Sequence, residues 1–445
     1  MPSRGVGQEA LSILNKLRLL AVTKSRLRAS PASLERIQLR LLRGALRRAY
    51  DEVELYRERF DKAGVAPSDV RSIADLAILP ITEKDDVRDS FPTGCTARGT
   101  DIERCRIQPT SGSSGQCMEV ALGRACDDYR AMATQRVYGM QGFAAWRKTA
   151  YIYPLPLPLN RNLGLYRNYY FPSAMAPRDI LAGLRAVRPH LLAATPSDLF
   201  ELLDATDEDL RSLRLRAVCV HSEPMSDDER SFLADRFGCR VATNYYCTEL
   251  WAVAGECTSG ALHQLCDNVV VEIVDDAGRP VPRGQVGHVL LTSLHAYVQP
   301  FIRYRIGDLA AWEDSDERCA CGLGLPRLAR LEGRDDDYLV YPDGRRLHPS
   351  KITVAVKSPC FPHAGQQIFR DYRITQDGPA HVRIQIVPGR DGAHFDACAA
   401  AGRENLAKLL GPPFEVALEV ASRLQRGSGG KRKIVERTFD RGEAH

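Results

Sequence analysis

A short run of serine, glycine and threonine is the segment of this sequence best suited to contact phosphate. It lies between Ile107-Gln108 and Val120-Ala121-Leu122, so we expect a hairpin-like loop between two strands. Its residues are Thr110, Ser111, Gly112, Ser113, Ser114 and Gly115. Glycines let backbone N–H groups approach phosphate oxygens, and hydroxyls add donors without adding charge. The run lacks the ending of a P-loop and the spacing of a hydrolase elbow, and on its own such a run is more often an ordinary loop.

Three cysteines and a histidine form a second candidate site. Cys257 and His263 are separated by five residues, Cys319 and Cys321 by one, and Gly322 follows. Three thiolates and an imidazole are a tetrahedral zinc set, and a Cys-x-Cys pair beside glycine suits a knuckle-like turn. The alternative is a group of free thiols with a core histidine. If zinc binds, its role is structural, because four protein ligands leave no open position for a substrate.

The elements that must position these residues follow an α/β pattern. Between about residues 150 and 302, short β-type runs alternate with helical stretches such as Asp227 to Phe237. The runs are Tyr151 to Tyr153, Ala217 to Val220, Val269 to Val274 and Val286 to Thr292. A cluster of charge and glycine, Glu332 to Asp337, precedes a last stretch with its own strands and helix. These are Tyr372 to Thr375, Val382 to Val387, Ala397 to Leu410 and Glu415 to Val420. We therefore expect a large domain, 1–333, and a small α+β domain, 334–445.

Composition excludes some classes of protein. The 445 residues carry 61 basic and 56 acidic side chains, too small an excess to indicate nucleic-acid binding. No stretch approaches the roughly 20 apolar residues of a membrane span, so we expect no membrane partner. Thirteen cysteines without a signal segment favour reduced thiols and a cytoplasmic location.

Residues 34 to 48 predict an amphipathic helix with a basic face, for which a solvated surface is the first interpretation.

Several further segments, in order along the chain, resemble the signature set of adenylate-forming enzymes, specifically the phenylacetate-CoA ligase-like group. The resemblance covers roughly residues 44 to 440. Its N-terminal part is Ala49-Tyr50-Asp51, Leu55-Tyr56-Arg57 and Leu79-Pro80-Ile81-Thr82-Glu83-Lys84, followed by the Ser/Gly loop. Then come His221-Ser222-Glu223-Pro224-Met225-Ser226, Asn244-Tyr245-Tyr246-Cys247-Thr248-Glu249, Arg303-Tyr304-Arg305-Ile306-Gly307-Asp308, Gly333-Arg334-Asp335-Asp336 and Gly429-Gly430-Lys431.

The resemblance implies a role for each matched residue. Tyr245 stacks on adenine, and Asp308 and Arg334 contact the ribose. Thr248, Glu223 and the Ser/Gly loop belong to the nucleotide site, and Glu249 holds Mg²⁺. Lys431, on a small mobile domain, bridges the acyl carboxylate and the α-phosphate, and Asp336 is the hinge. Many members of the group also bind zinc through cysteines and a histidine placed like Cys257, His263, Cys319 and Cys321.

Two positions depart from the family pattern. Gln116 replaces a lysine that usually follows the phosphate loop, which removes a positive charge near the β- and γ-phosphates. Tyr246 replaces a glycine at the floor of the acyl pocket, so we expect a reshaped or shortened pocket for an aromatic or small acid. Tyr151, Tyr153 and His221 are further candidates for its lining. Lys433 competes with Lys431 for the catalytic role, and Lys431 is preferred because it directly follows the glycines.

Three functions stay open at this point. The first is ATP- and Mg²⁺-dependent activation of a carboxylic acid to an acyl-adenylate, followed by transfer to CoA. The second sends the acyl group to an amine or to the thiol of a carrier protein, which the basic face of residues 34 to 48 could receive. The third is a non-catalytic nucleotide-binding protein, motivated by Gln116 and Tyr246. A homodimer is the assembly that we consider.

Overall fold

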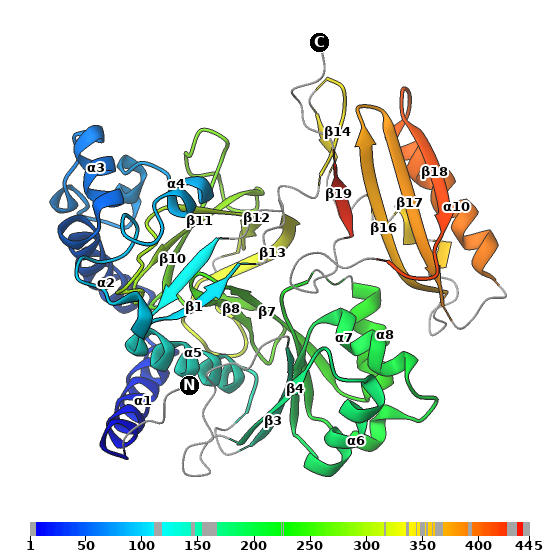
Figure 1. Ribbon diagram of the computed structural model, residues 1–445, viewed down its shortest axis with the longest axis horizontal. Helices are drawn as coiled ribbons and strands as arrows, with labels where there is room; N and C mark the ends of the chain where they lie inside the picture. Colours follow the sequence, from blue (N-terminus) through cyan, green and yellow to red (C-terminus); the bar gives the residue numbers. More distant parts are fainter. Residues whose placement is uncertain are drawn as a thin grey trace.

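The computed structural model describes most of the chain. The described residues are 6–110, 118–143, 147–153, 167–223, 225, 227–315, 317–334, 338–343, 345–347, 352, 355–357, 359–360, 368–389, 394–424 and 434–438. A central sheet has the strand order β10-β11-β12-β13-β9-β8-β7-β6-β5-β3-β4, and helices cover it (Figure 1). The expected mixed α/β class is confirmed.

One half of the central sheet is parallel. Its strands are β3 (Lys148–Tyr153), β4 (Arg167–Pro172), β5 (Leu191–Ala194), β6 (Ala217–Val220) and the first half of β7 (Arg240–Cys247). The helices between them are α6 (Pro177–Val187), α7 (Pro196–Asp204) and α8 (Asp227–Phe237). Every residue of β5 and β6 is buried, as expected where helices and sheet enclose a parallel strand. The carboxyl ends of these strands share one edge of the sheet.

The other half is antiparallel and begins within β7. Its further strands are β8 (Trp251–Glu256), β9 (Leu262–Gln264), β10 (Val269–Val274), β11 (Gly287–Ser293), β12 (Tyr304–Trp312) and β13 (Arg327–Arg334). A separate hairpin, β1 (Arg106–Pro109) with β2 (Glu119–Leu122), pairs antiparallel and matches the expected strands around the Ser/Gly loop.

Helices at the start of the chain pack around the antiparallel half (Figure 1). They are α1 (Val6–Arg26), α2 (Pro31–Glu52), α3 (Glu54–Ala63), α4 (Lys84–Asp89) and α5 (Arg124–Met140), with short 3-10 turns at Pro67–Asp69, Ala74–Ile78 and Ile102–Arg104. A further 3-10 turn, Leu210–Leu213, packs with the helices of the parallel half. In α2, Leu34, Leu42 and Leu46 are buried while the arginines expected on the basic face are exposed. Among the described helices, none is long and apolar enough to cross a membrane.

The C-terminal part forms its own sheet, of order β18-β17-β16-β19. Its elements are β16 (Phe369–Gly378), β17 (His381–Pro388), α10 (Phe395–Leu410), β18 (Glu415–Val420) and β19 (Val435–Arg437), beside a small hairpin of β14 (Leu339–Val340) and β15 (Arg346–Leu347). Its apolar cluster joins α10 to the sheet and takes its described members from Leu339 onward. Figure 1 shows this sheet next to α7 and α8.

The predicted elements agree with the structure to within a few residues at their ends. Helix α8 and strands β6, β10 and β18 have the predicted bounds, and α10 begins two residues before the predicted Ala397. Of these, β6 and β10 are the predominantly apolar runs that are typical of buried strands.

Candidate functional site

Strand β7 changes partners along its length, and this change creates the centre of the site. Arg240 to Thr243 pair in parallel with β6, whereas Asn244 to Cys247 pair antiparallel with β8. Tyr245 lies just beyond the change, and its Oη donates a hydrogen bond to Asp308 Oδ2 at 2.6 Å. Asp308 comes from β12, 63 residues later. Two residues predicted to contact one nucleoside are therefore neighbours.

Strand pairing adds the third residue predicted to contact the nucleoside. Asp308 and Arg334 are directly opposite each other on β12 and β13. The side chain of Arg334 lies outside the described part of the structure, so only its backbone position is known. Arg334 is thus on the strand beside Asp308, where the ribose hypothesis needs it.

A turn after β7 holds Thr248 and Glu249. Glu249 is buried, and its Oε1 accepts a hydrogen bond from Tyr304 Oη at 3.1 Å. The carbonyl oxygens of Thr248 and Glu249 both accept from Nη2 of Arg130, at 2.8 and 2.7 Å. The turn is therefore held from two sides, by β12 and by α5. A carboxylate so fixed is a suitable ligand for a hard cation such as Mg²⁺.

Thr110 anchors the Ser/Gly loop to the hairpin. Its N–H donates to the carbonyl of Met118 at 2.8 Å, and its Oγ1 accepts from the N–H of Met118 at 3.0 Å. Met118 and Tyr245 belong to one apolar cluster, so the base of the hairpin and β7 share a core. Ser111, Gly112, Ser113, Ser114, Gly115 and Gln116 lie outside the described residues, as do Asp336, Lys431 and Lys433.

Glu223 is attached to the start of α7. Its Oε2 accepts hydrogen bonds from the backbone N–H of Ser197 at 3.1 Å and from Ser197 Oγ at 2.7 Å. The carboxylate thus fixes the segment after β6 against the N-terminus of α7, where its charge is favoured by the helix dipole. In this arrangement Glu223 shapes the site through that segment.

Aromatic rings form a continuous chain of contacts on the other face of β7. The ring of Tyr246 lies 5.6 Å from that of Trp251 and 6.2 Å from that of His221, and His221 lies 5.9 Å from Tyr153. Tyr246 Oη is buried without a hydrogen-bond partner among the described residues, and burial raises the pKa of Tyr246 above its usual range. We call Tyr153, His221, Tyr246 and Trp251 the aromatic cluster. Tyr151 instead packs on Tyr170, at 5.2 Å.

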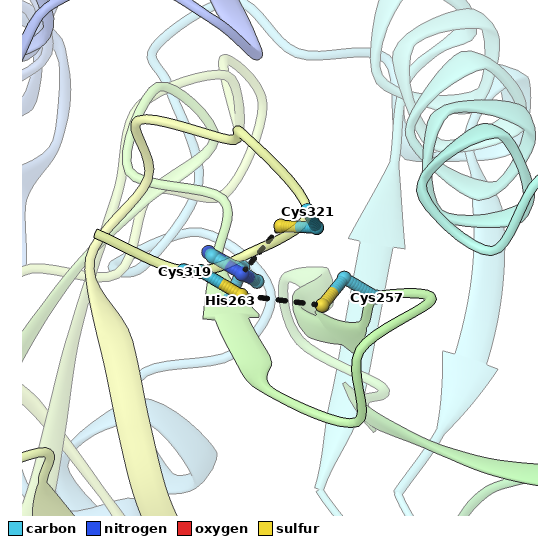
Figure 2. A group of neighbouring side chains, drawn as sticks. All are labelled: Cys257, His263, Cys319 and Cys321. Carbon is cyan, nitrogen blue, oxygen red and sulfur yellow. Dashed lines mark hydrogen bonds between the residues drawn. The ribbon is translucent and has the colours of Figure 1, made fainter. Parts of the chain in front are cut away.

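The four predicted zinc ligands come together. Cys257 directly follows β8, His263 lies on β9, and Cys319 and Cys321 lie in the connection between β12 and β13 (Figure 2). Their ligand atoms all lie within 4.8 Å of one another, with the Cys257 and Cys319 sulfurs 3.7 Å apart and Cys321 Sγ 3.4 Å from His263 Nε2. A tetrahedral zinc would separate two thiolates by about 3.8 Å and a thiolate from an imidazole nitrogen by about 3.6 Å.

The surroundings of this cluster favour a bound cation. His263 Nδ1 lies 3.0 Å from the carbonyl oxygen of Leu325, which can only accept, so Nε2 is left with its lone pair toward the thiols. Burial lowers the pKa of His263, which keeps the imidazole neutral. For the Cys319 thiol, burial opposes ionisation, but the Cys321 N–H and the neighbouring thiols outweigh it and lower the pKa. Backbone N–H groups of Ser259 and Leu323 also point at Cys257 and Cys321 sulfurs.

Arg130 is a site residue that the sequence analysis did not find. It is 3% exposed, and its Cζ lies 5.7 Å from the centre of the Trp251 ring. It therefore links the Thr248–Glu249 turn to the aromatic cluster. The one signal in the sequence was an arginine with mostly apolar neighbours, Tyr129, Ala131, Met132 and Ala133.

Residues 166–296 match a family model described as AMP-binding enzyme. Phenylacetate-coenzyme A ligase of Pseudomonas putida is 30% identical over 343 residues, which cover 73% of this chain and 75% of that protein. Phenylacetate-coenzyme A ligase of Aromatoleum evansii is 26% identical over 435 residues, 92% of this chain and 95% of that protein.

Solved structures share the fold. A structure of 2-hydroxyisobutyryl-CoA ligase described as being in the postadenylation state superimposes with a TM-score of 0.77 at 21% identity, over 94% of this chain and 91% of that chain. A structure described as being in the thioesterification state superimposes with a TM-score of 0.63 at 22% identity, over 93% and 91%. The chain thus superimposes more closely on the first of these two structures than on the second.

Proposed function

Because this chain belongs to the phenylacetate-CoA ligase family of adenylate-forming enzymes, we propose that it is a carboxylate-adenylating ligase that makes an acyl-CoA thioester. In the first half-reaction a carboxylate oxygen attacks the α-phosphorus of ATP, forming acyl-AMP and releasing pyrophosphate. In the second, the sulfur of CoA attacks the acyl carbon, AMP leaves, and the thiol proton is lost. Neither step needs strong acid or base catalysis. The rate enhancement is therefore expected to come from positioning of the reactants and from electrostatic stabilisation of the transition state.

The observation that carries this proposal is the meeting of Tyr245 with Asp308 at 2.6 Å, beside the position of Arg334. A flat ring supplies a stacking surface for adenine, and a carboxylate can accept from both ribose hydroxyls. Glu249 would hold Mg²⁺, which neutralises charge on the phosphates. Thr248 and the loop from Thr110 to Gly115 would contact the phosphates themselves.

We assign the second domain to residues 334–445, with Asp336 as the hinge and Lys431 as the catalytic lysine. The described apolar cluster of the C-terminal sheet includes no residue before Leu339, which supports two separate cores. Domains with separate cores move relative to one another unless a large apolar interface joins them. Rotation about Asp336 would bring Lys431 to the reacting carboxylate for adenylation and remove it afterwards.

The acid is proposed to be aromatic or small. Tyr246 supports this, because its ring stands among His221 and Trp251 and occupies space that a smaller residue would leave for substrate. Free thiols at all described cysteines support a cytoplasmic location. A homodimer remains part of the proposal, and light scattering of the purified protein tests it.

Transfer to a carrier protein or an amine is the second candidate function. The exposed arginines of α2, at positions 36, 40, 43, 47 and 48, support docking of an acidic carrier. Three of them are already engaged. Arg36 donates to Ser33 Oγ at 3.1 Å, Arg43 donates to the carbonyl of Arg71 at 2.9 Å, and Arg48 lies 4.7 Å over Tyr297. For this reason CoA is the preferred acceptor.

We further propose that Cys257, His263, Cys319 and Cys321 hold a structural zinc ion. Metal analysis of protein purified without chelator should give about one zinc per chain, and Cys321→Ser should remove most of it. Cys239→Ser, outside the cluster, is the matched control. Less than about 0.3 zinc per chain would argue against the site.

The test of the function is ATP–pyrophosphate exchange over a panel of carboxylates. The panel contains benzoate, phenylacetate, anthranilate, 2-hydroxyisobutyrate, other short aliphatic acids and amino acids, each with and without CoA. Exchange with one class identifies the acid, and CoA-dependent release of AMP identifies the acceptor. In that assay Lys431→Ala should lower adenylation by roughly 10²- to 10³-fold. No exchange with any acid, in a protein that still binds ATP, would favour the non-catalytic alternative.

A further inference from the structure

Arg130 carries a buried charge that the described structure satisfies only in part. The residue lies on α5, is 3% exposed, and uses Nη2 to hold the carbonyl oxygens of Thr248 and Glu249. Its Nε and Nη1 are buried without a hydrogen-bond partner among the described residues. A guanidinium keeps its charge and offers five N–H donors, so donors on both nitrogens remain unused.

The nearby acids have other partners, which are cations for two of them and a phenol for the third. On the same helix, Asp127 Oδ1 lies 2.5 Å from Arg106 Nη2, and Asp128 Oδ1 lies 3.2 Å from Lys16 Nζ. The Glu249 carboxylate accepts from Tyr304. No ion pair of Arg130 occurs among the described residues. Burying a cation without a counter-charge is costly, and the cost is recovered when an anion binds it away from water.

Arg130 stands between the two regions where substrate anions are expected. On one side is the Thr248–Glu249 turn, assigned above to phosphates and Mg²⁺. On the other is the aromatic cluster, because the guanidinium lies 5.7 Å from the Trp251 ring. The charge of Arg130 is also felt at Tyr153, whose pKa is raised by burial and partly lowered again by this arginine.

We propose that Arg130 is an oxyanion-binding residue of the active site. The oxyanion is either a phosphate of the nucleotide or a second carboxylate on the acid that is activated. The proposal rests on the proposed function, since it takes the Thr248–Glu249 turn as the place of the reaction. It extends that function by adding a buried cation to a site whose phosphate loop carries Gln116 in place of lysine.

A purely structural role makes a different prediction. If Arg130 only ties the turn to α5 through Nη2, its replacement lowers stability and affects every ligand equally. If it binds an oxyanion, its replacement affects only ligands that carry that group. Selectivity between ligands is therefore the informative measurement.

The experiment compares wild-type protein with Arg130→Gln and Arg130→Lys, with Arg124→Gln as control, since Arg124 is exposed on the same helix. Binding of ATP, AMP and inorganic pyrophosphate is measured by calorimetry. Exchange is measured for butyrate against succinate and for benzoate against terephthalate. Arg130→Lys keeps the charge without the planar fork, so it continues the test if Arg130→Gln does not fold.

Loss of about 10- to 100-fold in affinity for ATP and pyrophosphate, with AMP less affected, would assign the oxyanion to a phosphate. A loss of similar size confined to succinate or terephthalate would assign it to a second carboxylate. Values within twofold of wild type for all ligands, in folded variants, would overturn the proposal. If no acid supports exchange but pyrophosphate binding depends on Arg130, the oxyanion site stands while the ligase function fails.

Discussion

At the scale of single residues, the bond between Tyr245 and Asp308 is the contact with the clearest functional consequence. The phenol donates to a carboxylate, and such charge-assisted bonds contribute about 1.5 to 3 kcal/mol. The bond also orients the carboxylate, because it holds Asp308 Oδ2 at 2.6 Å from Tyr245 Oη. Removing the hydroxyl leaves the ring and its packing in place but takes away one bond that orients the carboxylate.

We therefore expect Tyr245→Phe to weaken ATP binding about tenfold and to lower the free energy of unfolding by about 1.5 to 3 kcal/mol. Calorimetric titration with ATP measures the effect. Tyr50→Phe is the matched control, because Tyr50 Oη also donates to an aspartate, Asp61, at 2.8 Å on an exposed surface. Equal ATP affinity in Tyr245→Phe and wild type would remove Asp308 orientation from the binding mechanism.

At the scale of elements, helix α7 begins with a reciprocal cap that contains a titrating group. Thr195 Oγ1 donates to Asp198 Oδ2 at 2.8 Å, and the Asp198 N–H donates back to Thr195 Oγ1 at 3.1 Å. Burial raises the pKa of Asp198 to about 6, and the charge of Glu223 adds to it, although the bonds from Thr195 act in the opposite direction. In the unfolded chain this carboxyl titrates near its ordinary value of 3.8.

The folded protein therefore binds the Asp198 proton more tightly than the unfolded chain does. The resulting stabilisation is complete below about pH 4 and is lost as pH rises through about 6. Asp198→Asn keeps an acceptor for the cap and does not titrate, so its stability relative to wild type should increase by about 2 kcal/mol between pH 4 and pH 7. Urea unfolding at the two pH values measures this. Parallel pH dependence in both proteins would contradict the raised pKa.

Two glycines within helices should respond oppositely to alanine. A Cβ on Gly402 in α10 would lie 2.5 Å from the carbonyl oxygen of Val356, whereas one on Gly44 in α2 meets nothing within 4 Å. Gly44→Ala should stabilise by about 0.5 to 1 kcal/mol because it removes backbone freedom from the unfolded chain. Gly402→Ala should destabilise by about 1 to 3 kcal/mol because of overpacking. Denaturant unfolding tests both, and a stabilised Gly402→Ala would show that the two segments separate easily.

At the scale of the whole molecule, polar contacts connect the C-terminal sheet to the large part. Lys357 Nζ lies 3.3 Å from Glu229 Oε1, and Arg370 Nε lies 3.4 Å from Asp204 Oδ2. A pocket separates the two parts nearby, lined by Phe200 and Glu201 of α7 and by residues of the C-terminal sheet. An interface of ion pairs beside a pocket opens more easily than a packed apolar one.

We expect the double variant Lys357→Ala/Arg370→Ala to populate more open arrangements in solution. Small-angle X-ray scattering should show a larger radius of gyration, with thermal stability of each part retained. Lys408→Ala is the control, because Lys408 pairs with Glu404 at 2.8 Å on the exposed surface of α10. Unchanged scattering in the double variant would mean that other contacts hold the two parts together.

Much of the fold was determined by the sequence alone. Apolar runs such as Ala217 to Val220 and the pattern from Asp227 to Phe237 specify local structure, because period and burial are local properties of the chain. The residue types of the candidate site could also be predicted from the sequence. The types of these residues, which are carboxylates, a tyrosine and a Cys/His set, indicate which chemistry they can perform, whatever their positions in the fold.

Only the tertiary structure decided which of these residues meet. Tyr245 reaches Asp308 across 63 residues, and the thiols of Cys257 and Cys319 meet across 62. Such contacts depend on strand order and register, which arise from the packing of the whole sheet and leave no local periodicity. Arg130 is the clearest example of a site residue that only the tertiary structure identifies, because in the sequence it is one charged residue of a helix. Only folding buries its guanidinium against the carbonyls of Thr248 and Glu249, where the cost of an unpaired charge indicates a ligand.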